Sequence, residues 1–483
     1  MEATIPLRLF LSLIIVLYFG RIGVMCTNST TYAGSGVEVW DAMYFSPNYL
    51  VQTDSELQTW RIVTALICGA IAAALSSAGG LGGGGLYVPI FNLLLGFNSK
   101  TSAALSSCMI LGGTLVNLFW YCSQRRADGL GPLIDYQVSL LCLPNVLLGI
   151  SAGVFCNVAS PSWLVTVILI IILLLITFRS CCNACQRWNH ETRALQSGLV
   201  SSETVEDNAC DLVVAAPSGD SHDENSDRTG KNEELKKPLL EHPGVQGLPQ
   251  YPLLKIGMLC ITWVAFLAVQ IVRGSSDGQN LFGIQTCGVI YWLVTLVQVP
   301  FAIVVTTCTI IYFQRKSLDV DALKNDGENP SPQEDPVHGG LVKMSWLPVY
   351  ALGAGFLGGM LGLGGGTIIN PLLLETGMHP KVTAATSSFM VVFSSSLSVG
   401  QFWLLGRIPE EYALISAALS LVFSVIGLQV VQTIIMKYGR FSLIVFAVSI
   451  VMGISAVLMA LFGTWDVVSQ VRQGEYMGFQ SPC

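Results

Sequence analysis

The chain has 483 residues, of which 52% are hydrophobic and 11% are charged, and its formal net charge is −7. Soluble domains usually carry about 25% charged residues. The composition therefore excludes an ordinary soluble domain and favours a protein with many membrane spans that has the lipid bilayer as its surroundings.

The N-terminus is typical of a secretory signal. Arg8 precedes an apolar run, and the segment that ends at Cys26 could form a cleavage site. Residues 1–26 are therefore expected to be a signal peptide, or a signal anchor that is retained. Asn28 begins an Asn-Ser-Thr glycosylation sequon. We expect residues 27–60 to be lumenal, and the protein to lie in the plasma membrane or an endomembrane of the secretory pathway.

Apolar stretches long enough to cross about 30 Å of hydrocarbon recur along the chain in three groups. The first group, 61–178, has predicted spans near 61–79, 81–97, 102–122, 134–156 and 161–178. A hairpin, 253–312, follows with spans near 253–273 and 288–312. The last group, 346–463, has spans near 346–364, 367–376, 383–405, 411–435 and 441–463, and a tail, 464–483, ends the chain. These twelve spans predict an all-α, polytopic transmembrane fold.

Two polar segments separate the groups. Residues 179–252 are rich in Ser, Asp, Glu, Asn and Pro, and residues 313–345 are similar but shorter. Their composition predicts disorder, and the bias of Lys and Arg among the loops predicts that both are cytosolic. Neither segment has the chemistry that binds nucleic acid.

Three cysteines, Cys181, Cys182 and Cys185, follow the predicted end of a membrane helix. Palmitoylation is one interpretation of such juxtamembrane cysteines. Reduced thiols without a role are the other, and the sequence leaves both open. A zinc site is not expected, because no second pair of ligands follows.

Two glycine-rich stretches resemble each other. "GGLGGGGLYVPIF" begins at Gly79, and "LGLGGGTIINPLLLETG" begins at Leu361. When the two prolines are aligned, with one gap after them, the matched residues are Gly82, Gly83, Gly84, Pro89, Ser106 and Ser107 in the first copy and Gly364, Gly365, Gly366, Pro371, Ser387 and Ser388 in the second. This register indicates an internal duplication.

The number of crossings predicts how the two copies are oriented. Five spans and a two-span hairpin precede the second copy, so an odd number of crossings separates the starts of the copies. The copies would then insert in opposite directions, as the inverted repeats of many secondary transporters do. If residues 61–97 crossed only once, the repeats would instead be parallel.

The glycine stretches predict broken helices at a central site. Irregular backbone at membrane depth occurs only where protein or water satisfies its polar groups. A helix that restarts after such a break presents its N-terminus, which favours an anion. The candidate substrate-binding residues are Gly82, Gly83, Gly84, Gly85, Ser106, Ser107, Gly364, Gly365, Gly366, Asn370, Thr386, Ser387 and Ser388. The alternative is that these small residues serve only close helix packing.

Charged residues are almost absent from the middle of the spans. Glu375 is the nearest approach, and it is either a coupling carboxylate or a solvated helix end. No catalytic, nucleotide-binding, cofactor or metal motif is present, so neither an enzyme nor a cofactor is expected.

The segments "LGGGGLYVPIF" and "LGLGGGTIINPLLL", each followed by a Ser-Ser helix, resemble the sulfite exporter TauE/SafE family. The resemblance covers about residues 60–178 and 346–463, and the long loop and added hairpin are similar to those of the plant members. The first copy has one extra glycine and no polar residue at the position of Asn370. The resemblance implies a multi-span permease that exports sulfite or related sulfur-containing anions.

Two other functions compete with a transporter of small anions. A membrane scaffold would recruit cytosolic partners through residues 180–250, but this would leave the duplicated glycine stretches unexplained. An intramembrane enzyme would need a nucleophile with a base, or a pair of carboxylates or histidines, and the spans lack them.

Overall fold

The computed structural model describes residues 55–79, 83–124, 132–211, 252–273, 288–325, 341–376, 378, 380–438, 442–473 and 478. Their regular secondary structure is helical, which confirms the predicted all-α fold. The expected signal segment, 1–26, the sequon at Asn28 and the first of the candidate glycines, Gly82, lie outside the described residues.

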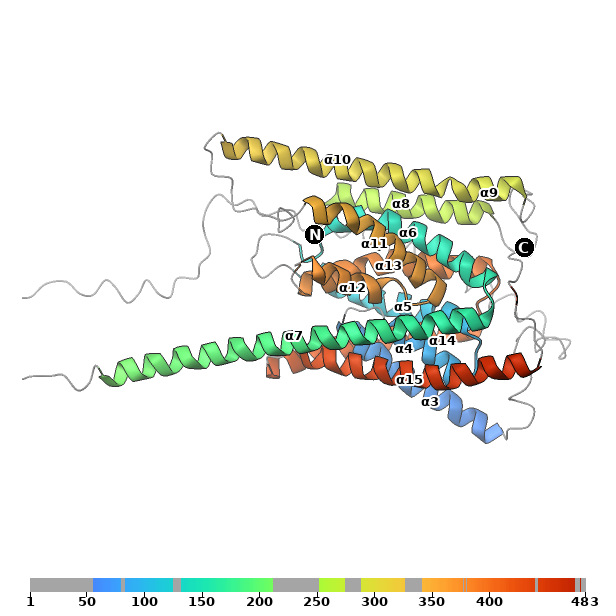
Figure 1. Ribbon diagram of the computed structural model, residues 1–483, viewed down its shortest axis with the longest axis horizontal. Helices are drawn as coiled ribbons and strands as arrows, with labels where there is room; N and C mark the ends of the chain where they lie inside the picture. Colours follow the sequence, from blue (N-terminus) through green and yellow to red (C-terminus); the bar gives the residue numbers. More distant parts are fainter. Residues whose placement is uncertain are drawn as a thin grey trace, which may run out of the picture.

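The helices are labelled in Figure 1 in chain order. They are α3 (Ser55–Gly79), α4 (Gly84–Leu93), α5 (Ser99–Cys122), α6 (Tyr136–Ala159), α7 (Ser162–Asp211), α8 (Leu253–Arg273), α9 (Val289–Leu296), α10 (Gln298–Asn325), α11 (Leu341–Leu361), α12 (Gly366–Glu375), α13 (Pro380–Leu404), α14 (Glu410–Tyr438) and α15 (Ser442–Gln473).

In the described part of the chain, nine helical segments are long and apolar enough to cross a membrane. They lie in α3, α5, α6, α7, α8, the consecutive pair α9–α10, α13, α14 and α15. The apolar stretch of α11, Trp346–Leu361, is shorter. The protein is therefore a multi-pass membrane protein, as the composition predicts.

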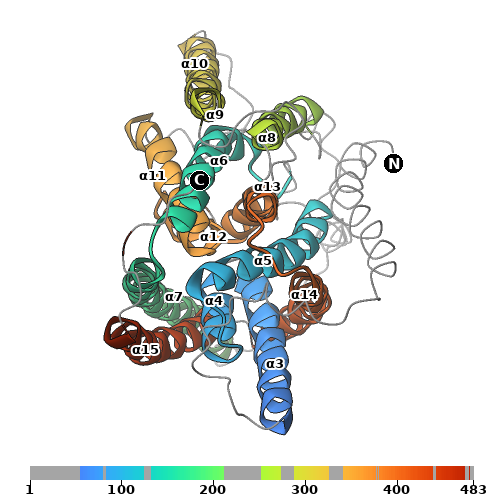
Figure 2. The ribbon, with the colours of Figure 1, turned by 90° about the vertical axis from the view of Figure 1, so that its right-hand side faces the viewer.

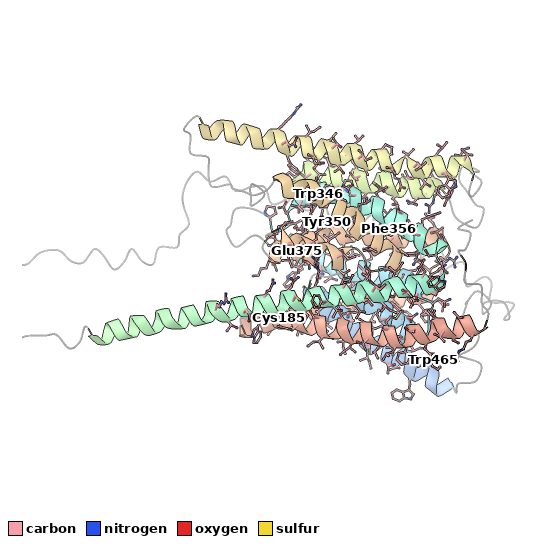
Figure 3. All side chains as sticks on the ribbon, in the orientation of Figure 1. Cys185, Trp346, Tyr350, Phe356, Glu375 and Trp465 are labelled. Atoms are coloured by element: carbon pink, nitrogen blue, oxygen red, sulfur yellow. The ribbon has the colours of Figure 1, made fainter. Side chains whose placement is uncertain are left out.

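The prediction of twelve full spans is wrong at α4 and α12. Each of these helices has 10 residues, which corresponds to about 15 Å, or half of the hydrocarbon thickness. Figure 3 shows how the second pair turns back: Trp346 and Glu375 lie at the same end of the molecule, and Phe356 lies deeper. The pair α11–α12 is therefore a helical hairpin with a break at its tip, and α3 and α4, which also pack on each other, form the corresponding hairpin of the first copy.

Three helices continue beyond the spans that the sequence predicts. Helix α7 extends through residues 179–211, where disorder is expected. Helix α10 reaches Asn325, and α15 reaches Gln473. The polar composition of these extensions marks the end of the membrane-buried segment but does not end the helix.

The helices form a buried centre and an exposed periphery. Of the apolar windows, 100% of the one in α13 and 89% of the one in α5 are buried inside the protein, against 28% in α7 and 22% in α9–α10. Figure 2 shows α5 and α13 in the middle of the bundle, with α3, α10 and α15 at its edge. The exposed apolar side chains of the outer helices thus face lipid.

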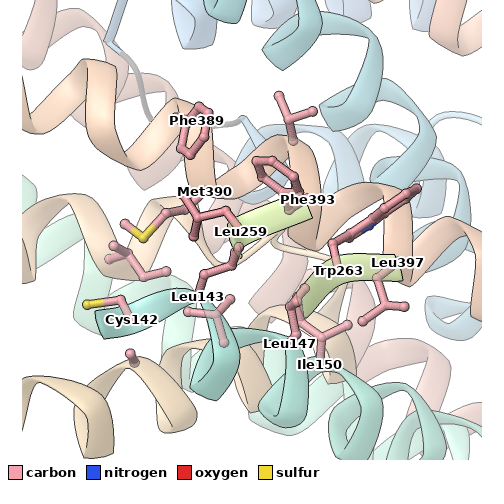
Figure 4. Packing of buried hydrophobic residues seen from close by; sticks show 14 of the residues in the cluster. Cys142, Leu143, Leu147, Ile150, Leu259, Trp263, Phe389, Met390, Phe393 and Leu397 are labelled. Carbon is pink, nitrogen blue, oxygen red and sulfur yellow. The ribbon is translucent and has the colours of Figure 1, made fainter. Parts of the chain in front are cut away.

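Large side chains fill the space between α6, α8 and α13 (Figure 4). The indole of Trp263 lies edge-on to the ring of Phe393, with 6.4 Å between ring centroids. Its N–H donates to the hydroxyl of Ser396 at 2.9 Å, so the one polar atom of this buried indole is satisfied. This cluster fixes α8 against the central helix.

Helices α6 and α11 approach so closely that their backbones touch. A methyl group added at Gly149 or Gly153 would overlap with carbonyl oxygens of α11, and one added at Gly355 would overlap with the carbonyl oxygen of Val146. Small residues at such a crossing replace side-chain contacts by backbone packing, which is a common way for membrane helices to associate.

Candidate functional site

The predicted breaks are present in both hairpins, and glycine conformation creates them. Gly83, with φ of 73°, precedes the first residue of α4. Gly362, Gly364 and Gly365 have φ between 65° and 70° and separate α11 from α12. These backbone angles are unfavourable for residues with a side chain, so the local sequence dictates where α4 begins, where α11 ends and where α12 begins.

The two breaks meet inside the molecule. A methyl group added at Gly84 would overlap with the Cα of Leu363 and lie 2.6 Å from its carbonyl oxygen. One added at Gly362 would overlap with the backbone of Ala103 in α5. The start of α4 therefore packs directly on the break of the other hairpin, and no side chain separates them.

Of the predicted serines, Ser106 and Ser107 lie at these breaks. The hydroxyl of Ser106 donates to the carbonyl oxygen of Gly362 at 2.7 Å. The hydroxyl of Ser107 donates to Ala103 O at 3.0 Å and lies 3.2 Å from that of Ser398. These bonds connect α5 to the second hairpin and to α13.

The predicted hydroxyls of α13 have different roles. The Thr386 hydroxyl accepts the backbone N–H of Asp135 at 2.9 Å, just before α6 begins. Ser387 donates to Ala384 O at 3.2 Å. Ser388 is buried, and its Oγ has no hydrogen-bond partner among the described residues. Of these three, Ser388 has no hydrogen bond among the described residues, and the Thr386 hydroxyl accepts one in the bond to Asp135, which leaves its own proton free to donate.

The remaining candidates on α4 and α12 lie within the two half-helices, and all of them except the half-buried Pro371 are buried. Gly85 and Pro89 belong to α4, whereas Asn370 and Pro371 belong to α12. The side chain of Asn370 is 5% exposed. The prolines lie inside the half-helices rather than at the breaks, which the glycines make.

Glu375 lies at the outer end of α12. Its carboxylate is 3.0 Å from the guanidinium of Arg179 on α7, and both side chains are at least half exposed. Figure 3 shows Glu375 and Cys185 at the same end of the bundle. An exposed pair of this kind contributes little to stability, and its position is far from the breaks.

Sequence reasoning missed a group of polar residues beside the start of α4. The hydroxyls of Ser76 and Tyr87 lie 2.8 Å apart, and Ser77 donates to the side-chain oxygen of Asn117. All four side chains are at most 3% exposed. They stand singly in apolar helices, so no spacing in the sequence marks them. Only the packing of α3, α4 and α5 brings them together.

Comparisons with known proteins agree with the glycine motifs. The family described as sulfite exporter TauE/SafE matches residues 3–180 and 253–465. Sulfite exporter TauE/SafE family protein 2 of Arabidopsis thaliana is 38% identical over 89% of this chain and 88% of its own length. Family protein 1 of the same plant is 37% identical over 91% and 92%.

A third relative, Sulfite exporter TauE/SafE family protein 5 of Arabidopsis thaliana, is 35% identical over 89% of this chain and 88% of its own length. No solved structure gives a significant match. The family match spans both hairpins and every helix described above apart from the outer ends of α7 and α15. The chain therefore belongs to the sulfite exporter TauE/SafE family, which its two glycine-rich segments resemble.

Proposed function

We propose that the protein is a secondary transporter that exports small anions, namely sulfite or related sulfur-containing anions. Membership of the family makes it a transporter rather than an enzyme. The observation that carries the proposal is the contact between the two glycine breaks, where Gly84 packs on the backbone of Leu363. Broken helices that meet inside the protein are the usual binding-site architecture of secondary transporters.

The proposal includes two inverted repeats, α3–α7 and α11–α15. The packing of the helices supports them, because contacts occur in matched pairs. Helix α3 packs on α14, and its counterpart α11 packs on α6. Helix α5 packs on α14 as α13 packs on α6, and the counterparts α5 and α13, like α7 and α15, pack on each other. A two-fold relation between the halves would generate this pattern.

The direction of the hairpins agrees with an inverted arrangement. In Figure 1, the chain enters α3 from one end of the bundle and α11 from the opposite end. The α3–α4 hairpin turns back, so it contributes an even number of membrane crossings. The number of crossings between the start of α3 and the start of α11 therefore stays odd. The two half-helices α4 and α12 then point away from the breaks toward opposite sides of the membrane.

The chemistry of the breaks suits an anion. The first backbone N–H groups of a helix have no intrahelical acceptor, and the N-terminus carries a partial positive charge. Here such a terminus lies among buried hydroxyls and at membrane depth, where water does not compete. Selectivity for sulfur-containing anions rests on the names of the relatives alone and is part of the proposal.

Transport in proteoliposomes tests the function. The purified chain is reconstituted, and efflux of labelled sulfite, sulfate and organosulfonates is measured with and without a pH gradient. We expect efflux of sulfite or an organosulfonate above that of protein-free vesicles, and an effect of the gradient would identify proton coupling. If none of these anions moves faster than in protein-free vesicles, the proposed function is wrong.

A further inference from the structure

Six buried polar side chains gather beside the start of α4. Helices α3, α4, α5 and α14 contribute them, and we call them the α4 polar cluster: Ser76, Ser77, Tyr87, Asn117, Ser420 and Ser424. None is more than 3% exposed. The cluster includes four residues described above and adds two serines of α14.

Glycines bring the helix start and the serines of α14 into the cluster. A methyl group added at Gly83, the residue before α4, would lie 2.6 Å from Ser76 Oγ. One added at Gly113 of α5 would lie 2.9 Å from Ser424 Oγ and 3.0 Å from Ser420 Oγ. The backbone thus reaches hydroxyls that any larger residue at these positions would displace.

Two of the hydroxyls are unsatisfied. Ser420 lies beside the Tyr87 hydroxyl, yet neither Ser420 Oγ nor Ser424 Oγ has a hydrogen-bond partner of good geometry in the described residues. A buried polar group without a partner is unfavourable. Hydroxyls next to a helix N-terminus would be satisfied by a ligand that accepts hydrogen bonds.

The equivalent place in the second half can be located from packing. Gly427 of α14 packs on Ala74 of α3, and Gly153 of α6 packs on Phe356 of α11. Ala74 and Phe356 stand at the same distance before Pro89 and Pro371 in the aligned repeats. Helix α6 is thereby set in register with α14.

The second half is apolar where the first is polar. In this register the counterparts of Ser76, Ser77, Tyr87, Ser420 and Ser424 are Gly358, Gly359, Ile369, Val146 and Ile150. Asn117 alone keeps a polar counterpart, Ser398. The space beside Gly365 is bounded by the side chains of Ile369 and Val146 and by the carbonyl oxygen of Ala354, at 3.7, 3.9 and 3.8 Å from an added methyl group, and a carbonyl oxygen does not donate to an anion. The two helix starts are therefore chemically unequal.

We infer that the transported oxyanion binds at the α4 polar cluster rather than at both breaks, and that it carries a single negative charge. The inference rests on the proposed transport function and assigns its site and the charge of its ligand. Since every member of the cluster is buried, the ligand reaches it only when the helices around the cluster move apart.

The absence of charge in the cluster argues for a monoanion. Within the described residues, the buried cations are Lys100 and Arg273, at the ends of α5 and α8. The cost of removing an ion from water rises with the square of its charge, so a dianion costs about four times as much as a monoanion. Neutral hydroxyls and one amide suit hydrogen sulfite or a sulfonate better than sulfate.

Binding to the full-length purified chain tests the inference by isothermal titration with sulfite, methanesulfonate and sulfate. The variants are Ser420→Ala and Ser424→Ala, which remove hydroxyls that have no hydrogen bond of good geometry among the described residues. Thr177→Val is the matched control, because the Thr177 hydroxyl is also buried and unpartnered but lies on α7, beside α15. The melting temperature of each variant is measured without ligand.

We expect each serine variant to bind sulfite and methanesulfonate about tenfold more weakly, the usual effect of losing a hydrogen bond to a charged ligand. Its melting temperature should equal or exceed that of the unmodified chain, and the control should keep full affinity. The unmodified chain should bind methanesulfonate at least tenfold more tightly than sulfate.

Each part of the inference, and the proposed function itself, would be contradicted by a different result. If the unmodified chain binds anions and both serine variants bind as tightly, the assignment of the site is wrong. Sulfate binding as tight as that of methanesulfonate would overturn the single charge. If the unmodified chain binds none of the three anions, the proposed function itself fails.

Discussion

Residue 84 has room for no side chain larger than the hydrogen atom of glycine. Gly84 is the first residue of α4 and contacts the backbone of Leu363. The two residues on either side of Leu363 are glycines with positive φ, which set the course of the backbone there. A flexible side chain could move away from an intruding methyl group, but two backbones cannot separate without shifting both hairpins. The contact between the breaks therefore depends on single glycines.

We predict that Gly84→Ala lowers the melting temperature and abolishes sulfite efflux. Overpacking of this kind typically costs about 1–3 kcal/mol. Gly257→Ala is the control, since Gly257 is a helical glycine with nothing within 4 Å of an added methyl group, and alanine there favours the helix by ~1 kcal/mol. A Gly84→Ala protein that melts and transports like the unmodified chain would contradict the contact.

Two serines of the candidate site should respond oppositely to alanine. Ser106 bonds the buried carbonyl of Gly362, so Ser106→Ala leaves that oxygen unsatisfied, at about 1–3 kcal/mol. Ser388 Oγ has no partner in the described residues, so Ser388→Ala should keep or raise the stability. Thermal unfolding of the two purified variants provides the comparison, and equal losses in both would show that the bonding pattern is wrong.

Among the elements, α7 combines a lipid-facing span with a long polar continuation. Its apolar window ends at Gln186, and Cys181, Cys182 and Cys185 are exposed on the last turns before that point. Within the described residues no group of three His, Cys, Asp or Glu side chains is placed to hold a metal ion. A cysteine at the edge of the bilayer is instead suited to receive an acyl chain, which would lie in the adjacent lipid.

We predict that these cysteines are S-acylated in cells by a long-chain acyl-CoA thioester, with release of the free CoA thiol. Hydroxylamine-dependent mass tagging should add up to three tags to the chain, and changing all three residues to serine should remove them. Cys308→Ser is the control, because Cys308 is exposed but lies inside the apolar window of α9–α10. Tags that persist in the triple variant would exclude this site.

The crossing of α6 and α11 gives an element-scale prediction. Gly355→Ala places a methyl group on the backbone of α6 and should destabilise the protein by about 1–3 kcal/mol. Gly353→Ala, on the same helix, meets nothing within 4 Å and should be neutral or stabilising. The difference in melting temperature between the two variants reports how much a methyl group at the contact between α6 and α11 destabilises the protein. Equal melting temperatures would mean that the two helices do not touch at Gly355.

For the molecule as a whole, sidedness follows from the crossings. The segments between α7 and α8 and between α10 and α11 join helix ends on one side, whereas the turn at Gly406 between α13 and α14 lies on the other. We expect the first two to be cytosolic. In sealed cytosol-out vesicles, protease should cut between residues 212 and 251 but not at a cleavage site inserted after Gly406. Protection of the first segment would reverse the topology.

Much of this architecture is predictable from local sequence. Glycines and hydropathy place the breaks and the spans, because both effects act within a few residues. What hydropathy overestimates is length: α4 and α12 are apolar but too short to cross. The partners of each helix, such as α6 with α11, and the gathering of Ser76, Tyr87 and Ser420 depend on contacts between distant segments, which leave no periodic signal.

The continuation of α7 has a mechanical consequence. From Gln186 to Asp211 the helix runs unbroken, a distance of about 38 Å at 1.5 Å per residue. Inside the bundle α7 packs along α15 and contacts α12. A tilt of about 5° at the membrane surface would displace the far end by roughly 3 Å for a rod of this length. The long helix thus amplifies small movements at the membrane surface. A fluorophore or binding partner near Asp211 would report movements of the transport core without making contact with that core.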